Sequence, residues 1–337
     1  MNFMNKYILL SAIISISFLF ISCGKKNSST SLNAMDTFMT IQAYGKKSDI
    51  ALEKTKKLIY QIEQNISTTN PTSDVYRLNH GENISVSNDT LILAKYSLDF
   101  AKQTNGVFNP ALYPITSAWG FTTEDYKVPS NEQIKELLTL TDYSKIQIDN
   151  NSIKLKTGMA LDFGAVGKGY TGDQAIKLLR ENGINSALLD LGGNIQVLGT
   201  KADGTKWNVG IKSPWTGKAA ASIKIADKAI ITSGGYERFF TADDGHEYIH
   251  IFDGKTGMPV NNGITGVTII TESGLYADAL STAMFAMGLT DATTYWKQHP
   301  DFEMIIFTEN HDLYYTEGLH GELNLLADFN SVNIIHK

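Results

Sequence analysis

One acid and one hydroxyl stand a helical turn apart in an apolar stretch near the C-terminus. The segment LYADALSTAMF (residues 275–285) has the composition of a buried helix, in which Asp278 and Thr282 stand out. Residues at i and i+4 share a helix face, so the two side chains point the same way. A buried carboxylate must be paired, protonated or bound to a cation. The residues alone leave a salt bridge, a neutral acid and a Mg²⁺ site open, the last because a carboxylate, a hydroxyl and carbonyls are oxygen ligands.

A glycine-rich loop precedes a predicted helix at 170–182. It reads LDFGAVGKGY (residues 161–170), with a glycine at 164, 167 and 169 and a lysine at 168. Exposed amides, the helix N-terminus and Lys168 suit a phosphate or pyrophosphate. The P-loop pattern is not met, because only two residues separate Gly164 from Gly167 and Lys168 is followed by glycine. A tight turn without a ligand is the alternative interpretation.

Two further segments carry residues that could do chemistry. In YIHIFDGKTGMPV (residues 248–260), a strand bearing His250 runs into a turn, and Asp253 is typical of a turn-former. His250 could be a general base or a histidine satisfied within its strand. TSGGYERFF (residues 232–240) combines hydroxyls and glycines with Arg238, and could supply donors to a phosphate or form only a turn and an ion pair.

The elements that must position these residues follow from hydrophobic periodicity and turn signals. Helices are predicted at 48–65, 88–103, 274–288 and 290–298, and a capping box of Ser130 with Gln133 starts another that ends near 140. Strands are predicted at 35–43, 145–149, 153–157, 186–191, 194–199, 207–212, 221–226, 229–232, 248–252, 265–271, 303–308 and 312–316. Helices mixed with hairpin-like strands indicate an α+β fold with mainly antiparallel sheets.

The N-terminus has the features of an export signal. A short n-region with one lysine precedes an apolar run at 7–21 that is shorter than a membrane span, and Ser22-Cys23 fits a lipobox. We therefore expect a signal peptide at 1–22, acylation of Cys23, a flexible tether at 23–33 and a single domain at 34–337. The mature protein would be lipid-anchored on the extracytoplasmic face of a membrane.

Composition excludes several classes of function. The net charge of −6 gives no global attraction for nucleic acid. Cys23 is the only cysteine, which excludes intrachain disulfides, a thiol nucleophile in the mature domain and cysteine metal sites.

These segments, together with three more, resemble the ApbE family of FAD:protein FMN transferases. The additional motifs are MDT (residues 35–37), FNP through WGF (108–110 to 119–121) and DLGGN (190–194). The resemblance runs in order from about residue 34 to 310. It implies two packed lobes of a T-fold-like architecture that bind FAD between them and, with Mg²⁺, transfer FMN to a threonine or serine hydroxyl of a target protein, releasing AMP.

The resemblance also implies roles for individual residues. The metal would be held by Asp278, Thr282 and the Ala165 carbonyl, and His250 and Asp278 would be catalytic. FAD contacts would come from Met35, Trp119, Gly120, Phe121, Asp162, Lys168 and Phe252. The implied partners are acceptor flavoprotein domains of redox-driven ion pumps or extracytoplasmic electron carriers.

This chain departs from the family pattern at four positions. Asp36 replaces a glycine, Asn109 an aspartate, Gly235 an acidic residue, and Gly167 stands where alanine is common. Two alternatives to the transferase remain open from sequence. One is a Mg²⁺-dependent FAD pyrophosphatase that releases FMN and AMP, and the other is a non-catalytic FAD-binding lipoprotein.

Overall fold

A computed structural model describes residues 27–243 and 245–337. Its centre is a nine-stranded sheet, antiparallel throughout except for the edge pair of β14 and β16. In spatial order it consists of β1 (Asn27–Ala34), β2 (Thr37–Tyr44), β5 (Ala187–Asp190), β6 (Ile195–Leu198), β9 (Ala229–Gly234), β12 (Ile264–Thr271), β13 (Glu303–Thr308), β14 (Asp312–Thr316) and β16 (Ser331–Ile335). Three small sheets complete the strands. They are β15 (Leu323–Leu325) with β8 (Ala219–Ile225) and β7 (Trp207–Lys212), β10 (Phe239–Thr241) with β11 (Glu247–Ile249), and β3 (Gln147–Asp149) with β4 (Ser152–Lys154).

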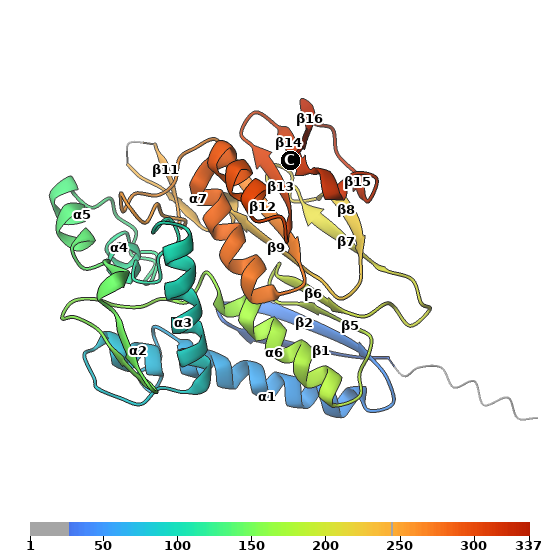
Figure 1. Ribbon diagram of the computed structural model, residues 1–337, viewed down its shortest axis with the longest axis horizontal. Coiled ribbons are helices and arrows are strands. Elements are labelled where there is room, and N and C mark those ends of the chain that lie inside the picture. The colour runs from blue at the N-terminus through green and yellow to red at the C-terminus, as the bar shows by residue number, and fades with distance from the viewer. Residues whose placement is uncertain (1–26, 244) are drawn as a thin grey trace, which may run out of the picture.

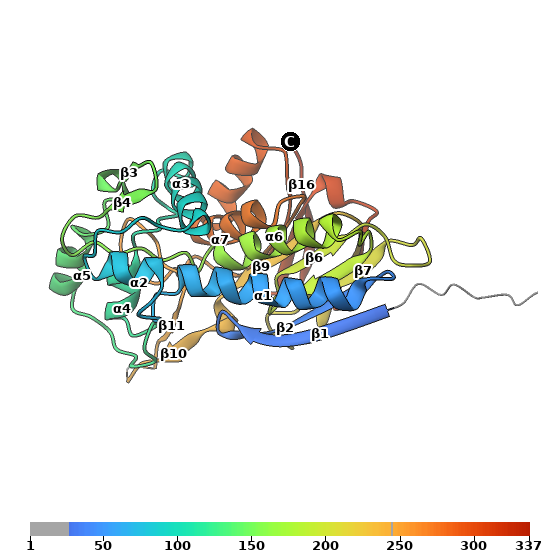
Figure 2. The same cartoon turned by 90° about the horizontal axis from the view of Figure 1, so that it is seen from below.

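Helices cover one face of the large sheet, as Figure 1 shows for α6 and α7. The helices are α1 (Ser48–Ile66), α2 (Asp74–Asn79), α3 (Asn88–Gln103), α4 (Tyr113–Ala118), α5 (Asn131–Leu138), α6 (Gly167–Glu181) and α7 (Gly274–Gln298). Seen from below, α1 runs alongside β1 and β2 (Figure 2). The predicted α+β class with mainly antiparallel sheets is confirmed.

The large sheet is buried on both faces because its strands are apolar in successive positions. Ile231 and Ile269 pack in the core beneath the helices, whereas Ile230 and Ile270 pack against the sheet of β7, β8 and β15. Neighbouring residues of a strand point to opposite faces, so each central strand contributes side chains to two hydrophobic cores. The result is three layers, with α7 fixed on the sheet between the two ends of the molecule.

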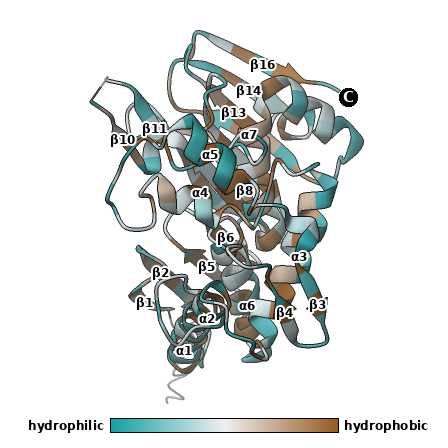
Figure 3. Cartoon of the chain, turned by 90° about the vertical axis from the view of Figure 1, so that its left-hand side faces the viewer, coloured by the Kyte–Doolittle hydropathy of each residue, from teal (hydrophilic) through white to brown (hydrophobic). Residues whose placement is uncertain are grey.

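The chain between α1 and α6 builds a second lobe, with α2 to α5 on the left of Figure 1. It has a small core of its own, to which Trp119, Phe121 and Phe252 contribute. Helix α5 turns a hydrophilic surface outward (Figure 3) and buries Ile134 in that core. An aromatic core therefore lies beside the segment that carries His250.

Several local predictions are confirmed at residue level. Helix α1 spans the predicted range to within one residue, and the capping box of Ser130 and Gln133 starts α5. Helix α3 begins and ends where predicted, and Ser87 is its N-cap.

Other predictions are wrong in instructive ways. The flexible tether predicted at 23–33 fails for its second half, because residues 27–33 lie in β1 and pair with β2 from Asn27 to Ala34. By contrast, the helices predicted at 274–288 and 290–298 are confirmed as two helical segments of α7, which are separated by non-helical backbone at Gly288 (φ 80°). The strand predicted at 248–252 ends at Ile249, and Phe252 forms an isolated bridge with Pro259. The predicted signal peptide and Cys23 lie outside the described residues.

Within the described part of the chain, no helix combines the length and apolarity needed to cross a membrane.

Candidate functional site

Asp278 projects from the second turn of α7 into a buried corner between α6 and the loop before β6. Its side chain is 5% exposed. Oδ2 accepts the Gly169 N–H at 2.8 Å and Oδ1 accepts the Asn194 side-chain amide at 3.0 Å. We call Asp278, Gly169 and Asn194 the carboxylate corner.

The carboxylate corner is short of positive charge. Burial raises the pKa of Asp278, against the opposing effects of the nearby Lys168 charge and of the two hydrogen bonds. Its carboxylate forms no ion pair with any lysine or arginine that the structure describes. A cation at the two carboxylate oxygens would offset the cost of burial.

Gly169 permits the close approach of α6 to α7. A Cβ at this position would lie 2.2 Å from the Gly274 carbonyl oxygen and 2.6 Å from Asp278 Cβ. The Gly169 carbonyl in turn accepts Gln196 Nε2 at 2.9 Å. Glycine is needed here because a side chain would push the two helices apart and move the backbone N–H away from the carboxylate.

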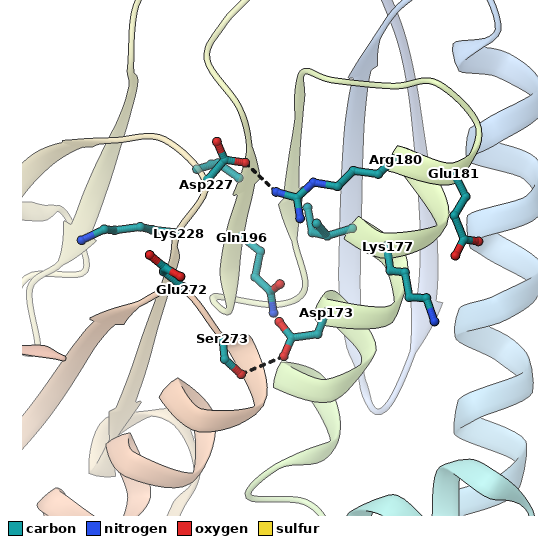
Figure 4. Close-up of a pocket in the computed structure, with 11 residues that line it drawn as sticks. Asp173, Lys177, Arg180, Glu181, Gln196, Asp227, Lys228, Glu272 and Ser273 are labelled. Carbon is teal, nitrogen blue, oxygen red and sulfur yellow. Dashed lines mark hydrogen bonds and ion pairs between the residues drawn. The ribbon is translucent and has the colours of Figure 1, made fainter. Parts of the chain in front are cut away.

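The start of α7 is fixed by Asp173 of α6. Its carboxylate accepts the Ser273 hydroxyl at 3.0 Å and the backbone N–H groups of Gly274 at 2.6 Å and Leu275 at 3.0 Å. Figure 4 shows Asp173 pointing at Ser273 from a groove of about 410 Å³ whose lining residues include several charged side chains. None of the predicted site residues lines this groove, so it lies outside the predicted site.

Thr282 follows Asp278 by one turn, on the same helix face as predicted. Ser233 of β9 lies 3.3 Å from the Thr282 hydroxyl. The third predicted metal ligand, the Ala165 carbonyl, lies in the turn that leads into α6. The Gly169 N–H would be the helical donor to this carbonyl, but it bonds to Asp278 instead. Among the described residues no hydrogen bond to the Ala165 carbonyl is found, so its oxygen is available to a ligand.

Lys168 connects the two halves of the site. It is the second residue of α6, and its charge lowers the pKa of both Asp278 and His250. Asp162, earlier in the same loop, accepts the Gly164 N–H at 2.7 Å. Burial raises the pKa of Asp162, and the nearby Arg238 charge lowers it. The glycine-rich loop therefore supplies a cation whose charge acts on both the carboxylate corner and His250.

His250 is held by the backbone of Arg238. The Arg238 carbonyl accepts both the His250 backbone N–H at 3.1 Å and the His250 ring Nδ1–H at 3.0 Å. This arrangement assigns the proton to Nδ1 and leaves Nε2 as an acceptor. Burial lowers the pKa of His250 to about 4, aided by the charges on Arg238 and Lys168. The imidazole is therefore neutral near pH 7 and has the form of a base.

An aromatic wall lies next to His250. Trp119 is fully buried with its ring centroid 6.0 Å from that of Phe252, and Phe121 lies 5.7 Å from Phe252 and 6.5 Å from His250. Gly120 between them has φ 84°, and a Cβ there would collide with the Asp125 carbonyl at 2.0 Å. The predicted residues 119–121, Phe252 and His250 are thus brought together.

The hairpin of β10 and β11 leans on this wall. Its Phe240 and Tyr248 are cross-strand partners with ring centroids 5.5 Å apart, and Tyr248 lies 5.0 Å from Trp119. We call the pair of strands β10 and β11 the aromatic ribbon.

Met35 lies at the other end of the site, in the turn between β1 and β2. Met35 and Asp36 have φ of 51° and 57°, a left-handed turn that the usual glycine at 36 would adopt without strain. The Met35 sulfur is 3.7 Å from the Thr171 hydroxyl on α6, which also bonds to the Gly167 carbonyl. Met35 therefore lies against α6, the helix that begins with Gly167 and Lys168.

Sequence reasoning missed the residues that support the site. Asn194 belongs to the DLGGN motif, but no role was predicted for it. Its signal is a polar residue after two glycines, which have φ of 69° and 89°. Asp173 acts across a long stretch of chain and gives no local signal, whereas Ser233 belongs to the hydroxyl- and glycine-rich segment at 232–240, although its contact with Thr282 was not predicted.

The donor set fits a hard cation and a phosphate. Among the described residues, no group of three or more acidic, histidine or cysteine side chains could hold a metal. One carboxylate, one hydroxyl and one carbonyl suit Mg²⁺ that completes its shell with water and substrate phosphate. A neutral histidine and a lysine nearby complete the groups that phosphoryl-type transfer requires.

Comparison with known proteins gives one consistent result. The model of the ApbE family matches residues 35–306. The chain is 31% identical over 315 residues to the FAD:protein FMN transferase of Treponema pallidum (strain Nichols), covering 86% of this chain and 87% of that protein. It is 29% identical to a protein of the same name from Klebsiella pneumoniae (strain 342), covering 76% and 82%.

Solved structures agree with the sequence comparisons. The crystal structure of the ApbE protein from Thermotoga maritima is similar with a TM-score of 0.82 and 30% identity, covering 88% of this chain and 99% of that one. The flavin transferase ApbE from Vibrio cholerae gives a TM-score of 0.77 and 25% identity, covering 85% and 94%.

Proposed function

Since this chain belongs to the ApbE family, we propose a residue-by-residue account of how it transfers FMN from FAD to a target protein. Its substrates are FAD and a protein, and its product is a covalently flavinylated protein. The observation that carries the assignment of roles is that Lys168 precedes Gly169, the backbone donor to Asp278, at the start of α6, and that its charge acts on both Asp278 and His250. A pyrophosphate bound at Lys168 would have the carboxylate corner on one side and the base on the other.

The carboxylate corner is proposed as the metal side of the reaction. Asp278, the Thr282 hydroxyl and the Ala165 carbonyl would hold Mg²⁺, which neutralises charge on the pyrophosphate when bound. Gly169 and Asn194 fix the plane of the Asp278 carboxylate, and Lys168 adds positive charge for the phosphate oxygens.

His250 is proposed as the general base. Its Nδ1–H is committed to the Arg238 carbonyl, so Nε2 accepts the proton of the incoming threonine or serine hydroxyl. The hydroxyl oxygen forms a bond to the flavin-side phosphorus, the bond to the bridging oxygen breaks, and AMP leaves.

The aromatic wall and the two loops are proposed to hold FAD. Beside His250, FAD would be contacted by Trp119, Gly120, Phe121 and Phe252. The glycine-rich loop would contribute contacts from Asp162 and Lys168. Met35 would contact it from the far side of α6. An apolar wall of rings with a few polar groups is typical of a cofactor site.

A mass measurement tests the reaction. Residues 24–337 are mixed with FAD, Mg²⁺ and an acceptor domain from a redox-driven ion pump, and the acceptor is weighed. We expect an FMN-sized gain, absent when the acceptor threonine is replaced by valine. Free FMN and AMP with an unmodified acceptor would instead identify an FAD pyrophosphatase. FAD binding without either product would identify a non-catalytic FAD carrier.

Asp278→Ala tests the metal side. We expect Mg²⁺-dependent turnover to fall by at least about a thousandfold, because the charged metal ligand is lost. The matched control is Asp99→Ala, which removes an exposed carboxylate that pairs with Lys102. Full activity of Asp278→Ala would dispose of the metal assignment.

We also propose that the protein is exported and lipid-anchored through Cys23 after removal of residues 1–22. An enzyme that modifies membrane-bound electron carriers gains effective concentration from being held beside them. Cys23→Ser should move the protein from the membrane fraction to the soluble fraction. Unchanged partition would refute the anchor.

A further inference from the structure

We propose that the β11 edge of the aromatic ribbon is the docking site for the target protein, and that an extended segment of the target adds to β11 as a third strand. The inference rests on the proposed function, because it concerns how the acceptor hydroxyl reaches His250. It goes further by naming the surface and the kind of segment it binds.

The first observation is that the ribbon has free edges. β10 and β11 pair only with each other, and no other strand joins them within residues 27–243 and 245–337. Figures 2 and 3 show them at the periphery of the molecule, outside the nine-stranded sheet. Unpaired strand edges are templates for adding another strand.

The second observation is which backbone groups face outward. Hydrogen bonds join His250 to Arg238 at 3.1 Å and Ala242 to His246 at 2.9 Å. In an antiparallel pair, hydrogen-bonded and non-bonded partners alternate. The intervening pairs, Phe239 with Ile249 and Thr241 with Glu247, are therefore the non-bonded ones, and their N–H and C=O groups point away from the ribbon.

The third observation is where β11 leads. It ends at Ile249, directly before His250, so a strand paired with Glu247 and Ile249 would run alongside the proposed base. β10 begins at Phe239, directly after Arg238, so its outer edge follows Arg238 rather than the base. Of the two edges, β11 is the one whose strand continues into His250 and can guide a hydroxyl to Nε2.

The fourth observation concerns the chemistry of the surface. One face of the ribbon, with Phe240 and Tyr248, is supported by the aromatic wall. On the opposite face Phe239 is 45% exposed, and Asp243 and Glu247 are exposed nearby. An apolar anchor beside two carboxylates suits a segment that carries a threonine or serine with an apolar residue and a lysine or arginine near it.

Proline substitutions at the non-bonded pair provide a matched test. Glu247→Pro removes an outward N–H and places a ring on the β11 edge without breaking a bond inside the ribbon, whereas Thr241→Pro does the same to the β10 edge. The probe is the acceptor domain of the mass measurement above. We expect Glu247→Pro to raise its KM about tenfold with kcat within twofold, and Thr241→Pro to leave both unchanged.

Two further variants separate backbone pairing from side-chain effects. Phe239→Ser should raise the acceptor KM about threefold to tenfold. Glu247→Gln should raise it about threefold in low salt, with the difference lost in high salt, because it removes only a charge.

Measurements on FAD separate failure of this inference from failure of the proposed function. FAD affinity, followed by flavin fluorescence, should be the same in wild type and all four variants. If wild type does not label the acceptor, the proposed function fails. If wild type labels it and Glu247→Pro has the wild-type KM, or if Thr241→Pro is impaired equally, docking on β11 is overturned.

Discussion

The carboxylate corner and the aromatic ribbon face the same reaction but are built in opposite ways. In the corner, both oxygens of a buried carboxylate are held by groups from separate elements, and α6 and α7 touch through a glycine. The ribbon has one face against the aromatic wall and leaves Phe239 and the strand edges exposed. A metal and a pyrophosphate bind best to charges held in fixed positions, which the carboxylate corner provides. A protein substrate needs an accessible surface, which the aromatic ribbon provides.

The most direct test of this contrast is a substitution that separates α6 from α7 at their closest contact in the carboxylate corner. Gly169→Ala would force a methyl group against the Gly274 carbonyl, which must move α6 away from α7. We expect a loss of about 3 kcal/mol in the free energy of unfolding and a fall in turnover of about a thousandfold, because Asp278 loses its backbone donor. Chemical denaturation and the transfer assay measure the two effects.

Gly210→Ala is the control for that substitution. Gly210 lies in β7, where a Cβ would make only an ordinary 3.5 Å contact with Ala219. It should leave both stability and turnover near wild type. A Gly169→Ala protein with wild-type turnover would show that the corner tolerates displacement and that the contrast with the ribbon is wrong.

On the ribbon side, removal of the base should affect chemistry alone. His250→Ala is expected to slow transfer about a hundredfold, because a general base contributes at least that factor. FAD affinity should change little, since the aromatic wall and Lys168 remain. Addition of free imidazole should restore part of the rate, and a variant that neither slows nor responds to imidazole would remove His250 from the mechanism.

The sequence predicted what is local in both regions and missed what is distant. The pairing of Asp278 with Thr282 on one face followed from helical spacing, and the kink in α7 falls at Gly288, between the two helices predicted there. By contrast, Asn194 reaches Asp278 across 84 residues and Asp173 caps α7 from α6. β1 was missed because NSSTSLNA is polar; it becomes a strand by pairing with β2, which local propensity cannot reveal.

Asn194→Ala tests whether the corner depends on its side-chain donor as well as on its backbone donor. The substitution leaves Oδ1 of Asp278 without its partner but keeps the Gly169 N–H. We expect turnover to fall about tenfold, with a higher Mg²⁺ requirement, because partners of a metal ligand tune its orientation and affinity. Titration of activity with Mg²⁺ measures both changes, and Asn208→Ala, at an exposed position of β7, is the control.

The smallest expected effect is a pH dependence that should be nearly absent. An ordinary histidine base with a pKa of about 6.5 would lose about tenfold in rate between pH 7.5 and pH 5.5. Burial lowers the pKa of His250 to about 4, so the ring stays neutral over this range and keeps Nε2 as an acceptor. We therefore expect kcat/KM for FAD to change less than about twofold through this group.

The free energy of unfolding, unlike the rate, should depend on pH through His250, so folding must be checked at each pH. Because unfolded His250 accepts a proton near pH 6.5 while the folded chain resists it until about pH 4, this residue makes the fold less stable as pH falls through that window. Circular dichroism at each pH must show the protein folded before rates are compared. Burial also raises the pKa of Asp278, so the residual rate of His250→Ala across the same range measures the pH dependence that does not come from His250. The contrary result would be a wild-type kcat/KM that falls as pH drops through about 6.5, with no such fall in His250→Ala. It would mean that His250 is as exposed to solvent as the ribbon beside it, so that the open side of the site begins at His250 itself.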